Sequence, residues 1–285
     1  MKFLLISFLT ICSLSGSAQY YYNDIAGTRE TNQLMQTYQA QKVRMVSATG
    51  YDNKGVRATD FAEVQEIKEN GRLLRLSAIR NFNKTVTISR FDEQGRVISI
   101  IDSAADIQGI TNYTYDAAGR VSKVENIVLD STNAFNHTET HWWYYNEKGM
   151  PVKMWRVISN TGAETGIDSL EVRFTADEEG NIGDERTYRN NVETSYLYYY
   201  YDDQHRLLDL VRYNTRLKKL MPDFMLEYDE NGRIAQKTTT TSSLHLGYLI
   251  WRYIYNDKGL KSKEVLFNSD KQITGRIDYT YNFSQ

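Results

Sequence analysis

His137, Glu139 and His141 are the residues whose types and spacing come nearest to a metal site, in the run His-Thr-Glu-Thr-His. On an extended strand alternate side chains point to one face, so all three would lie together. Imidazoles and carboxylates are ligands that divalent metals accept. Residues two apart on a strand are nevertheless separated by roughly 7 Å, so one strand cannot easily close all three onto one ion. We therefore keep them as weak candidates, expect the polar face of a strand here, and predict no metal and no cofactor.

No motif in the sequence matches a common catalytic site. The chain contains no nucleophile elbow, no phosphate-binding loop and no dinucleotide fingerprint. Its acidic turns lack the Asp-x-Asp-x-Asp-Gly spacing of a calcium loop. Two carboxylates could still meet across strands, as they do in glycoside hydrolases. A hydrolase is therefore the least favoured alternative, and we predict that the protein is not an enzyme.

Aromatic side chains are the second group that could do chemistry, through stacking. The chain has 22 Tyr, 10 Phe and 4 Trp, and two aromatic runs, 142–145 and 196–201, place rings on both faces of their strands. Exposed flat rings stack on sugars and anchor protein interfaces. Burial of both faces, in a curled or layered sheet, is the alternative. On the first interpretation the candidate binding residues are Trp142, Trp143, Tyr144, Tyr198 and Tyr200.

The elements that must position these rings are hairpins that recur along the chain. The central copy reads Tyr-Asp-Ala-Ala-Gly-Arg-Val from Tyr115. The tyrosine ends a strand, the aspartate can accept backbone N–H groups in the turn, and the glycine takes a positive φ. The arginine and the apolar residue then begin the return strand. Related turns follow about every 24 to 31 residues, most clearly at Asp92 and Gly95, Asp116 and Gly119, and Asp229 and Gly232.

The return strands share a second feature. Apolar residues stand three apart, as in Leu73 and Leu76, Val97 and Ile100, Val121 and Val124, and Leu207 and Leu210. Strict alternation would space them by two or four, so this pattern predicts a bulge or a change of twist in each return strand.

The motif resembles the YD repeat of the RHS-repeat family, whose hallmark is Tyr-Asp-x-x-Gly-Arg followed by an apolar residue. The resemblance covers roughly residues 50–285 and is most specific at 91–97, 115–121 and 228–234. It implies antiparallel strands that, in large members of the family, spiral into a shell around a C-terminal toxin. The present chain stops inside a repeat, so the resemblance is expected to extend to the scaffold, without a toxin domain.

The N-terminal residues differ from the repeats. Residues 1–18 have the charge, the apolar stretch and the small residues of a secretory signal cleaved near Ala18, and the apolar stretch is too short to span a membrane. Lipid attachment at Cys12 is less favoured, because a bulky residue stands where lipoprotein signals have a small one. Cys12 is the only cysteine, so the mature chain can form no disulfide. Residues 19–49 are interpreted as an N-terminal cap, either with a short helix over 28–41 or irregular.

The sequence therefore predicts an all-β fold in which antiparallel hairpin repeats, at 50–285, form a twisted meander that can curl into a partial barrel or spiral. The net charge of −2, without basic runs, argues against nucleic acid or a membrane surface as partner. We expect a secreted, periplasmic or cell-surface protein that presents loops and rings to a glycan or an envelope protein. A structural shell or spacer that works with other chains is the alternative, and the sequence does not predict the oligomeric state.

Overall fold

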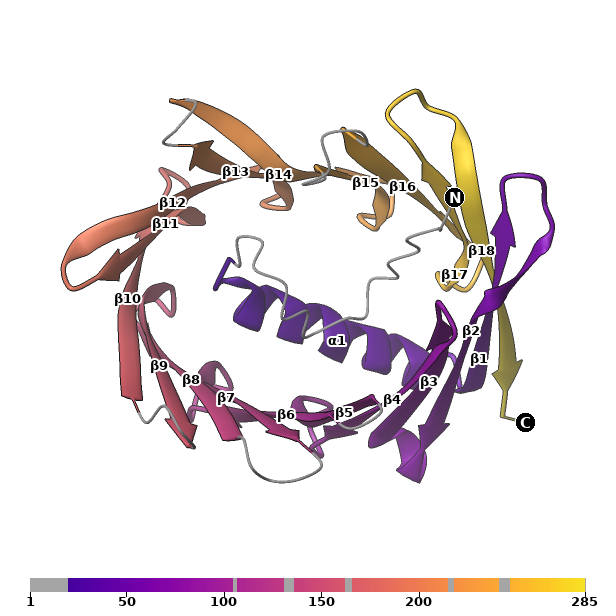
Figure 1. Ribbon diagram of the computed structural model, residues 1–285, viewed down its shortest axis with the longest axis horizontal. Coiled ribbons are helices and arrows are strands. Elements are labelled where there is room, and N and C mark those ends of the chain that lie inside the picture. Colours follow the sequence, from indigo (N-terminus) through magenta and orange to yellow (C-terminus); the bar gives the residue numbers. More distant parts are fainter. Residues whose placement is uncertain are drawn as a thin grey trace.

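The computed structural model describes residues 20–104, 107–130, 136–161, 166–214, 218–240 and 247–284. Eighteen antiparallel strands form one sheet that closes on itself around a single long helix (Figure 1). Residues 1–19, which hold the predicted signal sequence and Cys12, lie outside the described residues. Among the residues described, no helix is long and apolar enough to cross a lipid bilayer.

The first nine strands are β1 (Val43–Asp52), β2 (Arg57–Lys68), β3 (Leu73–Arg80), β4 (Asn83–Phe91), β5 (Val97–Ala104), β6 (Ile107–Tyr115), β7 (Val121–Asp130), β8 (Asn136–Tyr145) and β9 (Pro151–Thr161). The other nine are β10 (Gly166–Ala176), β11 (Ile182–Arg189), β12 (Val192–Tyr201), β13 (Leu207–Asn214), β14 (Lys219–Tyr228), β15 (Ile234–Thr240), β16 (Tyr248–Tyr255), β17 (Lys261–Phe267) and β18 (Ile273–Phe283). A short 3-10 helix, Glu69–Gly71, connects β2 to β3.

Closure of the sheet is the main result for the fold class. Each strand pairs with its neighbours in the chain, and β1 also pairs with β18, from Val43 opposite Phe283 to Asp52 opposite Gly275. The predicted all-β meander is therefore confirmed, and the curl that the sequence allowed is a closed barrel. Because every strand has a neighbour on both sides, the described sheet presents no open edge to other chains.

The recurrent turns obtain their shape from the aspartate and the glycine. After β6, one carboxylate oxygen of Asp116 accepts the backbone N–H groups two and four residues later, the second from Arg120 at 2.9 Å. Gly119 donates its N–H to the Asp116 carbonyl at 2.9 Å with φ of +78°, a conformation that only glycine adopts without cost. The turns at 92–95 and 229–232 repeat these bonds.

A bulge opens the return strand after most of these turns. In β7, Tyr115 pairs with Val121 while the preceding residue pairs with Lys123, which leaves Ser122 without a partner in the ladder. The extra residue allows Val121 and Val124, three apart, both to face the interior. The same shift occurs at the start of β5 and β13, as the apolar spacing predicted, and it also occurs at the start of β15. The exception is β3, whose register with β2 is continuous.

The turns that follow the even-numbered strands share one rim of the barrel, because neighbouring strands are antiparallel. Several successive turns on this rim are joined by the arginine of one turn and the tyrosine that precedes the next. Arg120 donates from Nε to Asp116 at 2.7 Å, and its guanidinium lies 4.5 Å from the ring centroid of Tyr145. The Tyr145 hydroxyl donates to the Val121 carbonyl at 2.6 Å. A Cβ at Gly149 would come within 3.4 Å of Arg120 Nη1, so glycine also makes room for the neighbouring arginine. The same pairing joins Arg96 to Tyr115, Arg206 to Tyr228 and Arg233 to Tyr255.

One pair of turns departs from the motif in a matched way. Asn181 stands in the place of the arginine, and His205 stands in the place of the next glycine, with φ of +59° and with Nδ1 3.1 Å from Asn181 Oδ1. The shorter asparagine leaves the space that the imidazole uses.

We predict that Asn181→Arg alone destabilises the protein by about 1 kcal/mol, because the guanidinium would meet the ring of His205. The double variant Asn181→Arg with His205→Gly should recover that loss, so that urea unfolding gives a coupling free energy of about 1 kcal/mol. Strictly additive effects would show that the two positions do not share this space.

Helix α1 (Asn23–Ala40) lies across the lumen of the barrel (Figure 1). Its 18 residues span roughly 27 Å at 1.5 Å per residue. The chain then turns at Lys42, with φ of +54°, and enters β1 at the rim that carries most of the motif turns. Residues interpreted from the sequence as a cap thus form an interior helix and the first strand. The physical reason is that wall side chains alone do not fill so wide a barrel.

The hydrophobic core lies between α1 and the wall. Met35, Tyr38 and Tyr21 are buried together with inward-facing residues of many strands, among them Val97, Val121, Met154, Val172, Leu197 and Leu210. Most inward positions near the middle of α1 are apolar, whereas both ends of the helix meet buried polar side chains. Those polar contacts define the first candidate site.

Candidate functional site: the lumen network and the outer aromatic band

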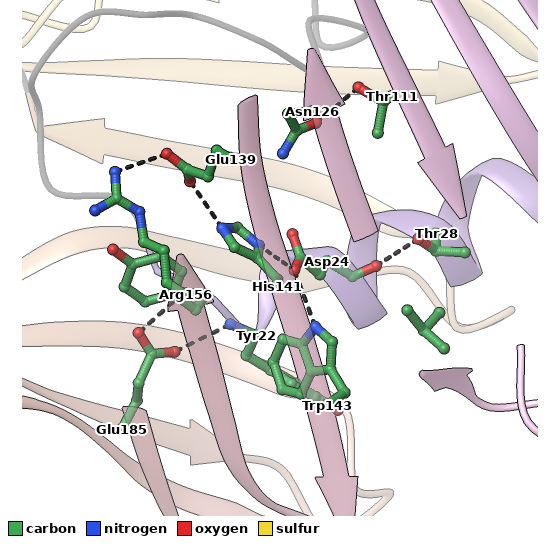
Figure 2. A network of polar contacts seen from close by, with 12 residues as sticks. Tyr22, Asp24, Thr28, Thr111, Asn126, Glu139, His141, Trp143, Arg156 and Glu185 are labelled. Carbon is green, nitrogen blue, oxygen red and sulfur yellow. Dashed lines mark hydrogen bonds and ion pairs between the residues drawn. The ribbon is translucent and has the colours of Figure 1, made fainter. Parts of the chain in front are cut away.

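A charged network on β8 and β9 holds the N-terminal half of α1 (Figure 2). Asp24 Oδ2 lies 2.6 Å from His141 Nδ1 and accepts the indole N–H of Trp143 at 3.0 Å. His141 Nε2 is 2.7 Å from Glu139 Oε1, and Arg156 donates to Glu139 Oε2 at 2.6 Å. Carboxylates and cations therefore alternate from the helix to the wall, and their charges balance.

The protonation states follow from these contacts. His141 has no exposed surface (0%), and burial by itself would lower its pKa, but the carboxylates of Asp24 and Glu139 raise that pKa to about 9. Burial would raise the pKa of Glu139, but hydrogen bonds from His141 and Arg156 bring it to about 2. At neutral pH an imidazolium thus lies between two carboxylates.

Glu185 on β11 is the second anchor of α1. Its carboxylate accepts the backbone N–H groups of Tyr21 and Tyr22 at 2.9 and 3.0 Å and the hydroxyl of Tyr199 at 2.7 Å. These N–H groups belong to the start of the helical turn, where the helix dipole favours an anion. Burial nevertheless raises the pKa of Glu185 to about 7, against the lowering effect of the three donors.

The C-terminal half of α1 is tied to β2 and β3 by another chain of polar contacts. The Tyr38 hydroxyl donates to Gln65 at 2.9 Å, the Gln65 amide donates to Glu63 at 2.9 Å, and Arg80 donates to Glu63 at 2.9 Å. In the middle of the helix, Asn32 accepts the backbone N–H of Val97 at 2.8 Å. The helix is therefore bonded to the wall along its whole length.

The lumen network positions a helix and offers little for chemistry on a substrate. Both ring nitrogens of His141 lie against carboxylates, so the imidazole has no nitrogen left for a substrate proton. His137 lies half-buried further along the same strand. The described part of the chain contains no group of three His, Cys, Asp or Glu arranged to hold a metal ion.

An open hollow of about 320 Å³ lies beside the C-terminal half of α1. A hydrolase would need two carboxylates in such a hollow. The hollow is lined by Gln36, Gln39, Asn70, Arg72, Asp92, Glu93, Gln94 and Gly95. Asp92 pairs with Arg96 at 2.7 Å, and Glu93 pairs with Arg72 at 3.6 Å. Both carboxylates thus have cationic partners at neutral pH, which is a poor arrangement for a general acid.

The second candidate site lies on the outer wall of β8–β12. Trp142 is opposite Trp155, and Tyr144 is opposite Lys153, so these four side chains share the outer face. The register continues these two rows to Tyr188 on β11 and Tyr196 on β12, and Tyr198 and Tyr200 follow Tyr196 on the same face of β12. We call these rings the outer aromatic band: Trp142, Tyr144, Trp155, Tyr188, Tyr196, Tyr198 and Tyr200.

The structure separates the rings that the sequence analysis grouped together. Trp142, Tyr144 and Tyr200 are exposed, by 44, 46 and 46%, and Tyr198 is half-buried. Trp143 is only 5% exposed and faces the lumen, where it stacks on Phe174, so its place among the candidate binding rings is corrected. Trp142 and Trp143 are neighbours in one strand, so their side chains must point to opposite faces of the closed wall, one outward and one into the lumen.

Cations hold the rings of the band against the wall. Lys123 lies 5.2 Å from the ring of Trp142, Lys153 lies 4.9 Å from that of Tyr144, and Arg186 lies 4.0 Å from that of Tyr196. Such cation–π contacts restrict the rings and so reduce the ordering cost of binding. Rings and charged groups therefore alternate along the outer face of β8–β12.

Sequence reasoning did not find Asp24, Arg156 or Glu185. Asp24 and His141 are separated by 117 positions, and Tyr21 and Glu185 by 164. No local pattern marks such partners, because each of these residue types is ordinary on a polar strand or helix face.

No protein-family model and no curated relative matches the chain. Among solved structures, it is similar to the Photorhabdus luminescens Tc holotoxin pore, with 10% identity and a TM-score of 0.31 over 78% of this chain and 16% of that one. It is also similar to a porin-like protein from Bacteroides uniformis, with 9% identity and a TM-score of 0.37 over 84% of this chain and 98% of that one. The chain thus spans only a small part of the toxin chain that it matches.

Proposed function

We propose that the protein is an exported, non-enzymatic repeat barrel of the YD-repeat kind that binds a glycan on its outer aromatic band. The observation that supports the proposal is the set of outward-facing rings on β8, β9, β11 and β12, several of them beside a lysine or arginine; Trp142, Tyr144 and Tyr200 are the exposed ones. Ring faces pack on the C–H faces of sugars, and the alternating charged groups supply hydrogen bonds to hydroxyls.

Two features favour binding over the other functions. A spacer that recruits further chains would need open sheet edges, and the described strands are paired on both sides. A hydrolase would need carboxylates free to exchange protons, and the buried carboxylates near α1 hold the helix instead. We also propose that residues 1–18 are a secretory signal that is removed by cleavage near Ala18.

The proposal predicts a saturable change in tryptophan emission when the purified chain is titrated with a panel of soluble glycans, because Trp142 and Trp155 lie in the band. Trp142→Ala should weaken the binding about fivefold or more, since one stacking ring contributes on the order of 1–3 kcal/mol. Ile254→Ala, on the outer face of β16, is the matched control because Ile254 is similarly exposed but lies outside the band. No response to any glycan in the panel would contradict the proposal, as would equal binding by Trp142→Ala.

A further inference from the structure

The turn between β2 and β3 departs from the motif of the other turns. Lys68 stands where the motif has its aspartate, so the turn lacks the carboxylate that would accept its backbone N–H groups. The two strands instead stay paired up to Lys68 opposite Leu73. Glu69 and Asn70 then take positive φ, of +52 and +54°, which residues other than glycine rarely adopt. Strained backbone of this kind is often kept where it serves a ligand site.

This altered turn brings the rim of the barrel against the last turns of α1. Gln39 donates from its carboxamide to the Gly71 carbonyl at 3.0 Å, and a Cβ at Gly71 would collide with the Gln39 side chain. At the next turn of the rim, a Cβ at Gly95 would lie 3.9 Å from Gln36 Cγ. The open hollow of about 320 Å³ therefore has walls from three separate elements, which are the end of α1 and two successive turns.

Carboxamides make up half of the lining of this hollow. Two of them have their orientation fixed by hydrogen bonds, since Gln39 donates to Gly71 and Gln94 Oε1 accepts from Arg96 at 3.4 Å. Every carboxamide can both donate and accept, and so can a hydroxyl group. The four carboxamides of the lining belong to Gln36, Gln39, Asn70 and Gln94. The wall is thus suited to a ligand rich in hydroxyl groups.

The charges around the hollow are paired. Arg72 Nη1 lies 3.6 Å from Glu93 Oε1, and Asp92 pairs with Arg96 at 2.7 Å. An anionic ligand would therefore meet two carboxylates, and a cationic ligand would have to displace two arginines. The described lining also offers no apolar side chain on which a hydrophobic ligand could pack. These features favour an uncharged polar ligand.

We propose that this hollow binds a single uncharged sugar unit through the carboxamides of α1 and of the two turns. Its volume is at the lower end of the roughly 300–1,000 Å³ found for small-molecule sites, which suits one sugar unit. The hollow lies beside β2–β5 and the end of α1, whereas the outer aromatic band lies on β8–β12. The inference therefore does not depend on glycan binding by the band.

Titration of the ¹⁵N-labelled full chain with glucose, galactose or N-acetylglucosamine tests this site by NMR. At least one of these sugars should move the amide signals of Gly71, Gln94 and Gly95 in a saturable way. Glucuronate and glucosamine, which add a charge, should bind about fivefold more weakly. The double variant Gln36→Ala, Gln94→Ala should weaken the binding of the neutral sugar at least about fivefold, because two hydrogen-bonding groups are lost.

Asn70→Gly separates binding from folding. The variant should bind about threefold or more weakly, while its urea midpoint should not fall, because glycine takes a positive φ without steric cost. Asn190→Gly is the matched control, since Asn190 has φ of +49° in the β11–β12 hairpin, and this variant should bind the sugar as the wild type does.

Three results would overturn the proposal. The first is the absence of a shift at the hollow with every neutral sugar, and the second is equal or tighter binding of a charged sugar. The third is unchanged binding by the double variant. Trp142→Ala should leave the shifts at the hollow as they are, so a loss there would place the sugar on the outer aromatic band instead and would also overturn the proposal.

Discussion

Replacing His141 by leucine is expected to destabilise the protein by about 3–5 kcal/mol, the cost typical of breaking a buried charge network. The substitution leaves Asp24 and Glu139 buried beside one another without the cation that joins them. Urea unfolding at pH 7 measures the loss, and amide hydrogen exchange in α1 should rise because the network holds that helix. Trp142→Leu, at the next and outward-facing position of β8, should change stability by about 1 kcal/mol or less.

The pH dependence of stability tests the same contact. The pKa of His141 is raised from 6.5 to about 9 in the folded protein, so its contribution is complete below pH 6.5 and is lost as pH rises through 9. That loss amounts to about 3 kcal/mol. Burial lowers the pKa of Lys237 to about 7, which acts in the opposite direction over part of this range. The difference between wild type and His141→Gln isolates the histidine, and a flat difference from pH 6.5 to 9 would contradict the assignment.

Glu185→Ala is expected to cost about 3–5 kcal/mol, because it leaves two backbone N–H groups and the Tyr199 hydroxyl buried without their acceptor. Glu185→Gln should cost less, since its amide oxygen can still accept while its NH₂ group opposes one of the donors. Thermal or urea unfolding measures both, with Glu178→Ala in an exposed turn as the control.

The protonation of Glu185 gives this prediction a second measurement. Its folded pKa is raised from 4.5 to about 7, so the stability it contributes is complete below pH 4.5 and falls as pH rises through 7. The cost of Glu185→Ala should therefore be larger at pH 5 than at pH 8. Equal costs at both values would mean that the carboxyl group does not titrate in this range.

The two anchors have a common consequence for the architecture. They join the start of α1 to β8, β9 and β11, while Tyr38 joins its end to β2. The helix thus cross-links opposite walls of the barrel (Figure 1). A rigid wall keeps the rings of the outer aromatic band at fixed spacings, and the proposed binding surface depends on that rigidity.

The sequence by itself determined the hairpins. Asp116, Gly119 and Arg120 act within five residues of one another, so their spacing predicts a turn directly. The apolar spacing also predicted the bulge in the return strand, because Val121 and Val124 stand three apart and both face the core. The sequence also predicted that the rings of β8 alternate between the two faces of the strand, but it did not show which face packs against the core.

Only the tertiary structure decided how the hairpins close and what fills them. Closure joins β1 to β18, and the residues interpreted as a cap became the helix inside, because a wide lumen must be filled. Asp24 meets His141 only once the barrel has formed.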